Sequence, residues 1–253
     1  MPDQPVAVVT GATGGIGGAV VQRLRTEGYI VVGLSRAAGS GADLHLPCDV
    51  RTDADVHEAA GAVRVRHGRC DALVCCHGHW PVTTPTLALD PRTFLEVLQT
   101  DVGGTLHVCQ HFGAMMLTQH QGAIVLLSSL HAWQTYPART AYAASKAAIG
   151  GLMRSLALEW GPLGVRVNAL LPWQVDGPRS QALIEAAQAQ GEDLREAYLR
   201  RTPLRRLVAP AEVASAVVFL LHNTVMNGCE LPLDGGVSCS MWYHPFQRGS
   251  DEP

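Results

Sequence analysis

The sequence has few charged residues, few aromatic residues and no surplus of basic ones. Charged residues make up 16% of its 253 positions and aromatic residues 6%, and 19 basic against 22 acidic side chains give a net charge of −3. Without a basic surplus or a run of like charges, the chain has no electrostatic footprint for polyanions. We therefore expect neither nucleic acid nor a membrane among its partners.

Long hydrophobic runs, targeting signals and paired cysteines are also missing. The most apolar late segment, 213–221, is too short to cross a bilayer, and the N-terminus lacks a basic region followed by an apolar stretch. The seven cysteines are an odd number and form no CxxC pair, which argues against a disulfide framework and a zinc ribbon. These absences predict a cytoplasmic protein with reduced thiols and no bound metal.

Short runs of Val, Ile and Leu alternate with segments of helical period, a pattern typical of a parallel sheet covered by helices. We expect one doubly wound, Rossmann-type α/β domain over residues 1–253, with a seven-stranded parallel sheet and helices on both faces. The stretch 173–210 contains no expected strand and is interpreted as an insertion that covers a substrate site. The strands are expected at 5–10, 29–34, 44–48, 71–76, 123–128, 165–170 and 230–233.

A glycine-rich turn follows the first expected strand and leads into an amphipathic helix. Its sequence, TGATGGIGG over 10–18, lets the backbone approach a pyrophosphate, which the free amides and the helix dipole attract. A tight turn without a ligand is the alternative, but the strand–turn–helix context favours nucleotide binding. The residues that we expect at the cofactor in this turn are Gly11, Thr13, Gly15, Ile16 and Gly17.

Ser35 and Arg36 stand where the second strand ends, at the place where a carboxylate would hold the ribose 2′-hydroxyl of NAD(H). An arginine there pairs with a 2′-phosphate, so the sequence favours NADP(H), and a solvated surface arginine is the alternative. Asp49 and Val50, after the third strand, are expected to reach the adenine. Asp49 has a second interpretation, as the cap of a helix that begins near residue 53.

Tyr142 and Lys146 lie one turn apart on a predicted helix, on the same inward stripe as apolar residues. A lysine on an inward face needs polar partners, and a cofactor crevice supplies them. Its charge would favour the phenolate form of Tyr142, which then exchanges a proton with a carbonyl or an alcohol. The alternative is a core tyrosine beside a snorkelling lysine. Ser129 follows the strand that precedes this helix.

Together these motifs resemble the short-chain dehydrogenase/reductase family, in the branch of about 250 residues that includes 3-oxoacyl-carrier-protein reductases. The resemblance extends over nearly the whole chain. The family's TGxxxGxG, YxxxK and catalytic serine fall on Thr10, Gly11, Gly15, Gly17, Tyr142, Lys146 and Ser129.

The resemblance implies hydride transfer at the nicotinamide C4, with NADP(H) favoured and NAD(H) as the alternative. Tyr142 would be the acid/base, Ser129 would bond the substrate oxygen, and Lys146 would bind the nicotinamide ribose. The fourth catalytic position, usually asparagine, falls on Asp101, whose backbone carbonyl would help to hold a water. The resemblance also implies a homotetramer or homodimer, and it places Gly78, Pro172 and Val175 at the cofactor.

Three departures from the family pattern concern the site. Cys75-Cys76-His77 replaces the usual Asn-Asn-Ala before Gly78, Asp101 replaces asparagine, and Gly177 replaces the threonine that would meet the nicotinamide carboxamide. These changes leave open a second hypothesis, a cofactor-binding regulatory or scaffold protein with weak or no catalysis.

Aromatic and polar residues gather after the strand ends on the side expected to carry the active site. Such a set is typical of a pocket for a small-molecule carbonyl or alcohol that contains a ring or polar groups, although part of it would only pack the insertion. The residues are His79, Trp80, His131, Trp133, Gln134, Trp173 and Gln174.

Overall fold

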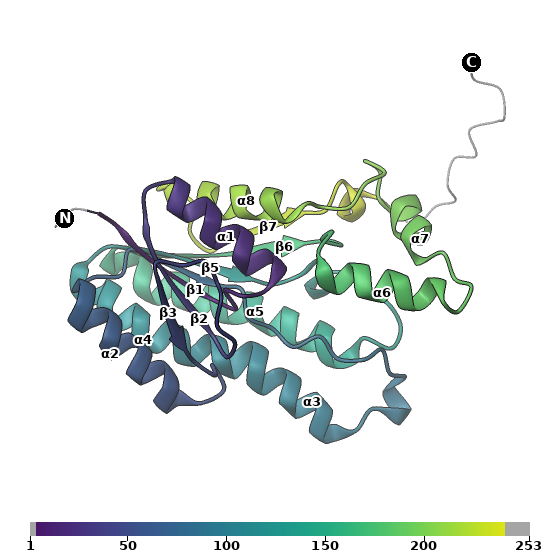
Figure 1. Cartoon of the computed structure of the whole chain (residues 1–253), viewed down its shortest axis with the longest axis horizontal. Helices are drawn as coiled ribbons and strands as arrows, with labels where there is room; N and C mark the ends of the chain where they lie inside the picture. The colour runs from purple at the N-terminus through teal and green to yellow at the C-terminus, as the bar shows by residue number, and fades with distance from the viewer. Residues whose placement is uncertain (1–3, 241–253) are drawn as a thin grey trace, which may run out of the picture.

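A computed structural model describes residues 4–240, and residues 1–3 and 241–253 lie outside the description. Seven parallel strands form one sheet in the order β3-β2-β1-β4-β5-β6-β7, which confirms the predicted fold class (Figure 1). The strands are β1 (Val6–Thr10), β2 (Ile30–Ser35), β3 (Leu44–Pro47), β4 (Ala72–Cys75), β5 (Gly122–Leu127), β6 (Val165–Pro172) and β7 (Glu230–Leu233).

Helices cover both faces of this sheet. One hydrophobic cluster joins the sheet to α2, α4 and α5, and a second joins its other face to α1 and α8. Successive residues of β5 serve the two clusters in turn, because neighbouring side chains of a strand point to opposite faces. The helices are α1 (Gly15–Thr26), α2 (Asp53–His67), α3 (Pro91–Leu98), α4 (Gly104–Gln119), α5 (Thr140–Trp160), α6 (Pro178–Gln188), α7 (Leu194–Arg201) and α8 (Pro210–His222).

The predicted strands match the observed ones to within two residues at each end. The largest difference is at β6, which continues to Pro172 because its last two residues pair with β7. β2 likewise reaches Ser35, which pairs with Pro47 of β3. Pairing with an edge strand extends both elements beyond their apolar runs.

The segment 173–210 contains α6 and α7, which pack on one another around Ile184, Tyr198 and Leu207. A π-helical turn, Gln99–Gly103, joins α3 to α4 and buries Asp101. In the described part of the chain, no helix is long and apolar enough to cross a membrane.

Candidate active site

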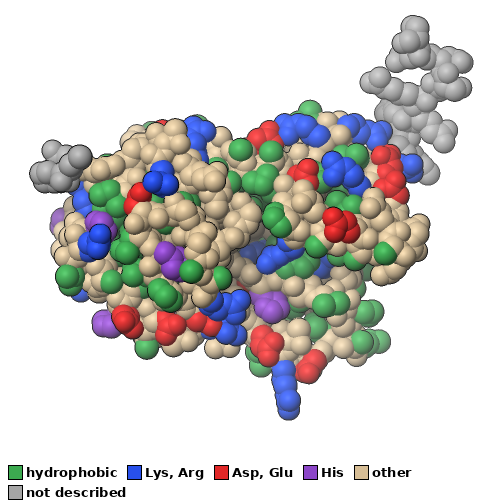
Figure 2. Space-filling view, viewed as in Figure 1, with side chains coloured by type: hydrophobic (Ala, Val, Ile, Leu, Met, Phe, Trp, Pro, Cys, Tyr) green, Lys and Arg blue, Asp and Glu red, His purple; other side chains and the backbone are tan. Residues whose placement is uncertain are grey.

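A cavity of about 400 Å³ opens where the parallel strands end, between the glycine-rich turn, α5 and α6. Figure 2 shows this side of the molecule hollowed near its middle, with basic side chains beside the hollow. Fifteen of the predicted site residues line the cavity. They are Thr13, Gly15, Ile16, Gly17, Gly78, His79, Trp80, Ser129, His131, Tyr142, Lys146, Pro172, Trp173, Gln174 and Val175.

The glycine-rich turn is too crowded for side chains at two of its positions. Gly11 has φ +61°, and a Cβ there would lie 2.8 Å from the backbone nitrogen of His77. A Cβ on Gly17 would overlap the Gly11 carbonyl oxygen. The turn therefore packs backbone against backbone and presents the N-terminus of α1 to the cavity, as pyrophosphate binding requires.

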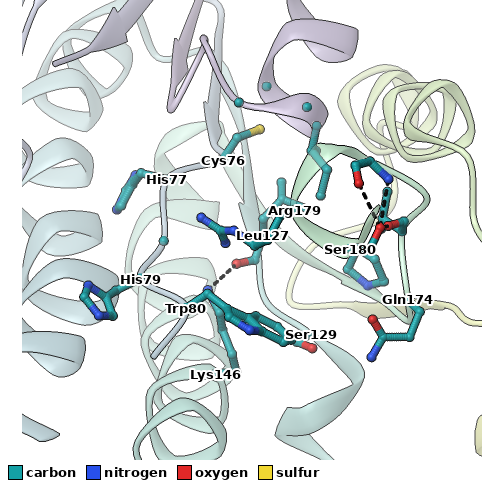
Figure 3. Close-up of a pocket in the computed structure, with 18 of the residues that line it drawn as sticks. Cys76, His77, His79, Trp80, Leu127, Ser129, Lys146, Gln174, Arg179 and Ser180 are labelled. Atoms are coloured by element: carbon teal, nitrogen blue, oxygen red, sulfur yellow. Dashed lines mark hydrogen bonds between the residues drawn. The ribbon is translucent and has the colours of Figure 1, made fainter. Parts of the chain in front are cut away.

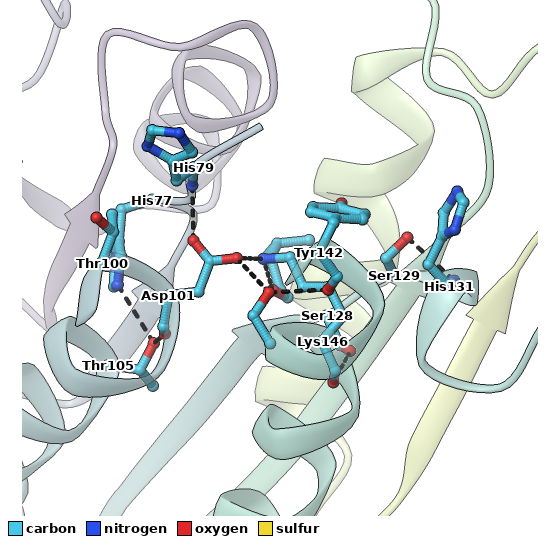
Figure 4. Close-up of polar contacts among 12 residues, drawn as sticks. His77, His79, Thr100, Asp101, Thr105, Ser128, Ser129, His131, Tyr142 and Lys146 are labelled. Atoms are coloured by element: carbon cyan, nitrogen blue, oxygen red, sulfur yellow. Dashed lines mark hydrogen bonds and ion pairs between the residues drawn. The ribbon is translucent and has the colours of Figure 1, made fainter. Parts of the chain in front are cut away.

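Ser129, Tyr142 and Lys146 come together from the end of β5 and from α5 (Figure 4). The Ser128 hydroxyl donates to the Lys146 carbonyl oxygen at 2.9 Å and so fixes the strand end to the helix. The Lys146 Nζ lies 5.5 Å from the centroid of the Tyr142 ring. The Ser129 Oγ accepts the His131 backbone N–H at 3.2 Å, which leaves its own hydroxyl proton for a ligand.

Lys146 forms a buried ion pair with Asp101, and their Nζ and Oδ2 atoms are 3.1 Å apart. A second Lys146 contact runs to the Leu127 carbonyl oxygen at 3.4 Å. Burial alone would lower the pKa of Lys146, but electrostatic interaction with Asp101, together with a further contribution from Tyr142, outweighs it, so this pKa lies above its ordinary value. The ammonium is therefore charged at neutral pH.

The His77 side chain connects two elements at the strand end that departs from the family pattern. Its Nδ1 lies 2.6 Å from the Thr10 Oγ1 and its Nε2 lies 3.2 Å from the Thr105 Oγ1, so the imidazole links β1 to α4. The Thr105 hydroxyl donates to the Asp101 carbonyl oxygen at 2.6 Å, so the His77 Nε2–H is the donor to Thr105. Burial lowers the pKa of His77 to about 4, consistent with this neutral tautomer.

Aromatic rings enclose the end of the cavity next to Tyr142. The Trp80 ring centroid lies 4.6 Å from that of Tyr142, and the His131 centroid lies 5.4 Å from it. Trp173 stacks on His131 at 6.3 Å. Burial, with a smaller effect of Arg139, lowers the pKa of His131 to about 4. This end of the site offers flat apolar faces and a neutral imidazole.

Trp133 and Gln134 lie outside the cavity, contrary to the prediction. Trp133 is 47% exposed, and its Nε1–H donates to Glu230 at 3.2 Å. Gln134 is also exposed and donates to the Ser238 carbonyl oxygen. Both follow a short 3-10 turn, Leu130–Ala132, which directs them away from the pocket while His131 remains inside.

The residues predicted for the adenosine end do not line the cavity either. Arg36 is exposed where β2 ends, and the Ser35 hydroxyl donates to the Ala37 carbonyl oxygen. Asp49 binds the Arg51 guanidinium, and this hydrogen bond lowers the pKa of Asp49. The cap interpretation of Asp49 is wrong, because Thr52 is the N-cap of α2 and makes no side-chain cap bond. Val50 packs against Gly104 of α4.

Sequence reasoning missed the contribution of α6. Its first turns bring Arg179, Ser180 and Leu183 to the cavity, across from His77 and His79 (Figure 3). Arg179 is close enough for its positive charge to act on Lys146. The sequence does show an arginine directly after Gly177-Pro178, where a helix begins. Whether this side chain enters the cavity depends on how α6 packs beside the glycine-rich turn.

The fold and the site define a Rossmann-type oxidoreductase. The chain matches, over residues 11–238, a family model described as "Enoyl-(Acyl carrier protein) reductase". It is 34% identical to D-threitol dehydrogenase of Mycolicibacterium smegmatis, covering 92% of this chain and 93% of that protein. It is 32% identical to galactitol 2-dehydrogenase of Rhizobium johnstonii, covering 92% and 95%.

A solved structure of NAD+-bound xylitol dehydrogenase superposes with a TM-score of 0.85 at 28% identity, covering 92% of this chain and 98% of that one. The protein belongs to the short-chain dehydrogenase/reductase family, and it is an oxidoreductase that acts on alcohol groups.

Proposed function

We propose that this protein is an NADP(H)-dependent oxidoreductase that interconverts a ketone and a secondary alcohol, with Tyr142 as the acid/base. The observation that carries the proposal is the convergence of Ser129, Tyr142 and Lys146 on one cavity that the glycine-rich turn also lines. This cavity provides a nucleotide cleft and a proton-transfer group within the same space.

The residues present fit a dinucleotide. The glycine-rich turn leaves no room for a Cβ at Gly17, and the N-terminus of α1 faces the cavity, where it would hold the pyrophosphate. Lys146 would bind the nicotinamide ribose with its ammonium. When bound, the cofactor supplies or accepts the hydride at the nicotinamide C4.

The protein's own residues handle the proton. In the reducing direction, the Tyr142 hydroxyl gives its proton to the carbonyl oxygen of the substrate, and in oxidation the phenolate takes the proton of the alcohol. The Ser129 hydroxyl donates to the same oxygen and fixes its position. The Lys146 charge stabilises the phenolate, because an opposite charge nearby favours the ionised form.

Polyhydroxylated alcohols are the first compounds to test as substrates, and they open the panel used below. Three similar proteins bear the names of D-threitol, galactitol and xylitol dehydrogenases. In this chain, Trp80 and Trp173 provide flat faces and His131 and Gln174 provide polar groups around the same end of the cavity. Segment 173–210 would cover a substrate held there, since residues of α6 line the same cavity.

The test is turnover by the purified protein and its Tyr142→Phe variant across this panel, with each cofactor. We expect Tyr142→Phe to lower kcat by about 10³-fold or more, because the phenyl ring has no proton to exchange. The NADPH dissociation constant should stay within about threefold, since the ring keeps its packing against Trp80. If Tyr142→Phe were as active as the unmodified protein, Tyr142 would not be the acid/base.

Assembly as a homotetramer or homodimer is part of the proposal. Leu106 on α4 and Leu158 on α5 are 38% and 80% exposed, and contact with a second copy would bury such side chains. Static light scattering gives the mass that decides between monomer, dimer and tetramer.

A further inference from the structure

The carboxylate of Asp101 contacts Lys146 directly. Asp101 is 1% exposed, and its side chain, at the π-helical turn before α4, points at α5. The 3.1 Å ion pair lies inside the protein, where two charges interact far more strongly than at the surface.

Two further groups hold this carboxylate in place (Figure 4). The His79 backbone N–H donates to Oδ1 at 2.6 Å, and the Ser145 hydroxyl donates to Oδ2 at 2.9 Å. The Asp101 carbonyl oxygen accepts the Thr105 hydroxyl within its own helix. The side chain of Asp101 therefore meets Lys146, while the backbone carbonyl is engaged elsewhere.

This arrangement leaves Lys146 ready for a ligand. An ammonium has three donors, and Asp101 and the Leu127 carbonyl oxygen take two of them. The third is available to a ribose hydroxyl in the cavity that Lys146 lines. The ion pair thus fixes the long lysine side chain without using its whole bonding capacity.

The same carboxylate changes the charge around Tyr142. Lys146 alone would put one positive charge beside the phenol, and Asp101 adds a negative one on the far side of that ammonium. Burial keeps Cys76, with a pKa of about 12, and His77, with a pKa of about 4, neutral near pH 7. The other titratable or charged groups near Lys146 and Tyr142 are His79, His131, Arg139 and Arg179.

We propose that Asp101, as a fixed negative charge beside Lys146, moves the pH range of alcohol oxidation upward. The inference rests on the proposed role of Tyr142. Its physical basis is that a buried negative charge disfavours a second one nearby, here the phenolate.

The test is the Asp101→Asn variant, which keeps an oxygen acceptor for the His79 N–H and removes the charge. For the most active alcohol of the panel, kcat/KM is measured from about pH 6 to about pH 10. The midpoint of its rise should move to lower pH by about one unit. If no alcohol is oxidised, the proposed function fails, and a second measurement decides the present inference independently.

That measurement is the ultraviolet titration of the phenolate in the free protein. Subtracting the curve of the matching Tyr142→Phe protein isolates Tyr142, and its midpoint should also fall by about one pH unit in Asp101→Asn. Circular dichroism and thermal melting verify that each variant is folded. If Asp101→Asn does not fold, Asp101→Ser replaces it, because it removes the same charge with a smaller side chain.

Two controls separate charge from other effects. Glu27→Gln removes a carboxylate that pairs with Arg23 on the surface of α1, and its midpoint should not change. Ser145→Ala removes one hydrogen bond to Asp101 but keeps the charge, so it should give less than about half the shift. An unchanged midpoint in the folded Asp101 variant, or an equal shift in either control, would overturn the inference.

Discussion

The proposed preference for NADP(H) rests on Arg36. This residue is exposed where β2 ends, and the glycine-rich turn follows β1 at the same carboxyl end of the parallel sheet. Asp49 contributes a negative charge nearby. Asp49 is held by Arg51, so its carboxylate is compensated rather than aimed at a ribose. This leaves Arg36 available for the 2′-phosphate of NADP(H).

We expect Arg36→Ala to raise the NADPH dissociation constant by about 10- to 100-fold, because a charge-assisted bond to phosphate is lost. The NADH constant should change less than about threefold, since NADH has no 2′-phosphate. Fluorescence titration with both cofactors measures this. Arg66→Ala, an exposed arginine at the end of α2, is the matched control. An unmodified protein that binds NADH more tightly, with no effect of Arg36→Ala, would contradict the preference for NADP(H).

At the scale of elements, two neighbouring glycines at the start of α1 differ in how much space a side chain would find. A Cβ on Gly17 would overlap the Gly11 carbonyl oxygen, whereas a Cβ on Gly18 would lie at an ordinary 3.7 Å from the Ala12 carbonyl oxygen. Both glycines belong to the same helix, so alanine improves helix propensity equally at the two positions. Any difference between the two variants therefore comes from contact with the turn.

We expect Gly17→Ala to lower the free energy of unfolding by about 2–4 kcal/mol and to abolish measurable cofactor binding, because the turn must shift. Gly18→Ala should keep binding and change stability by less than about 1 kcal/mol. Urea denaturation and cofactor titration of the two proteins check this. Equal effects at both positions would show that the close approach to Gly11 is not what requires glycine.

The features that the sequence predicts are those contained within a single element. Every strand was placed within two residues, and local motifs located Ser129, Tyr142 and Lys146, because apolar periodicity and a one-turn spacing are properties of a single element. Trp133 was misplaced because a short 3-10 turn directs it outward. Arg179 was missed because its contribution depends on the packing of α6 beside the glycine-rich turn, which no local pattern encodes.

The whole molecule should lose stability in mild acid, because two imidazoles, one buried and one partly buried, resist protonation. The folded-state pKa values of His77 and His131 are about 4, against 6.5 for an unhindered histidine. Between these values the unfolded chain binds more protons than the folded protein. The stability that the neutral rings provide is therefore complete above about pH 6.5 and is lost as the pH falls toward 4.

The contribution of His77 to this pH dependence can be measured separately from that of the other titratable groups. This residue is partly buried, and a difference of about 2.5 pKa units corresponds to about 3 kcal/mol, a large part of the 5–15 kcal/mol typical of folded proteins. His77→Gln does not titrate, so its free energy of unfolding should fall by about 3 kcal/mol less than that of the unmodified protein between pH 7 and pH 4.

Urea denaturation at several pH values in this range gives that difference. His77→Gln also loses part of the link between Thr10 and Thr105, so it should be less stable at pH 7. For this reason the pH dependence, rather than the stability at any single pH, is the quantity to compare. His57→Gln removes an exposed imidazole from α2 and should keep the pH dependence of the unmodified protein. If His77→Gln also keeps it, the ring between β1 and α4 takes up a proton without cost, and the neutral tautomer assigned from its two threonine partners is wrong.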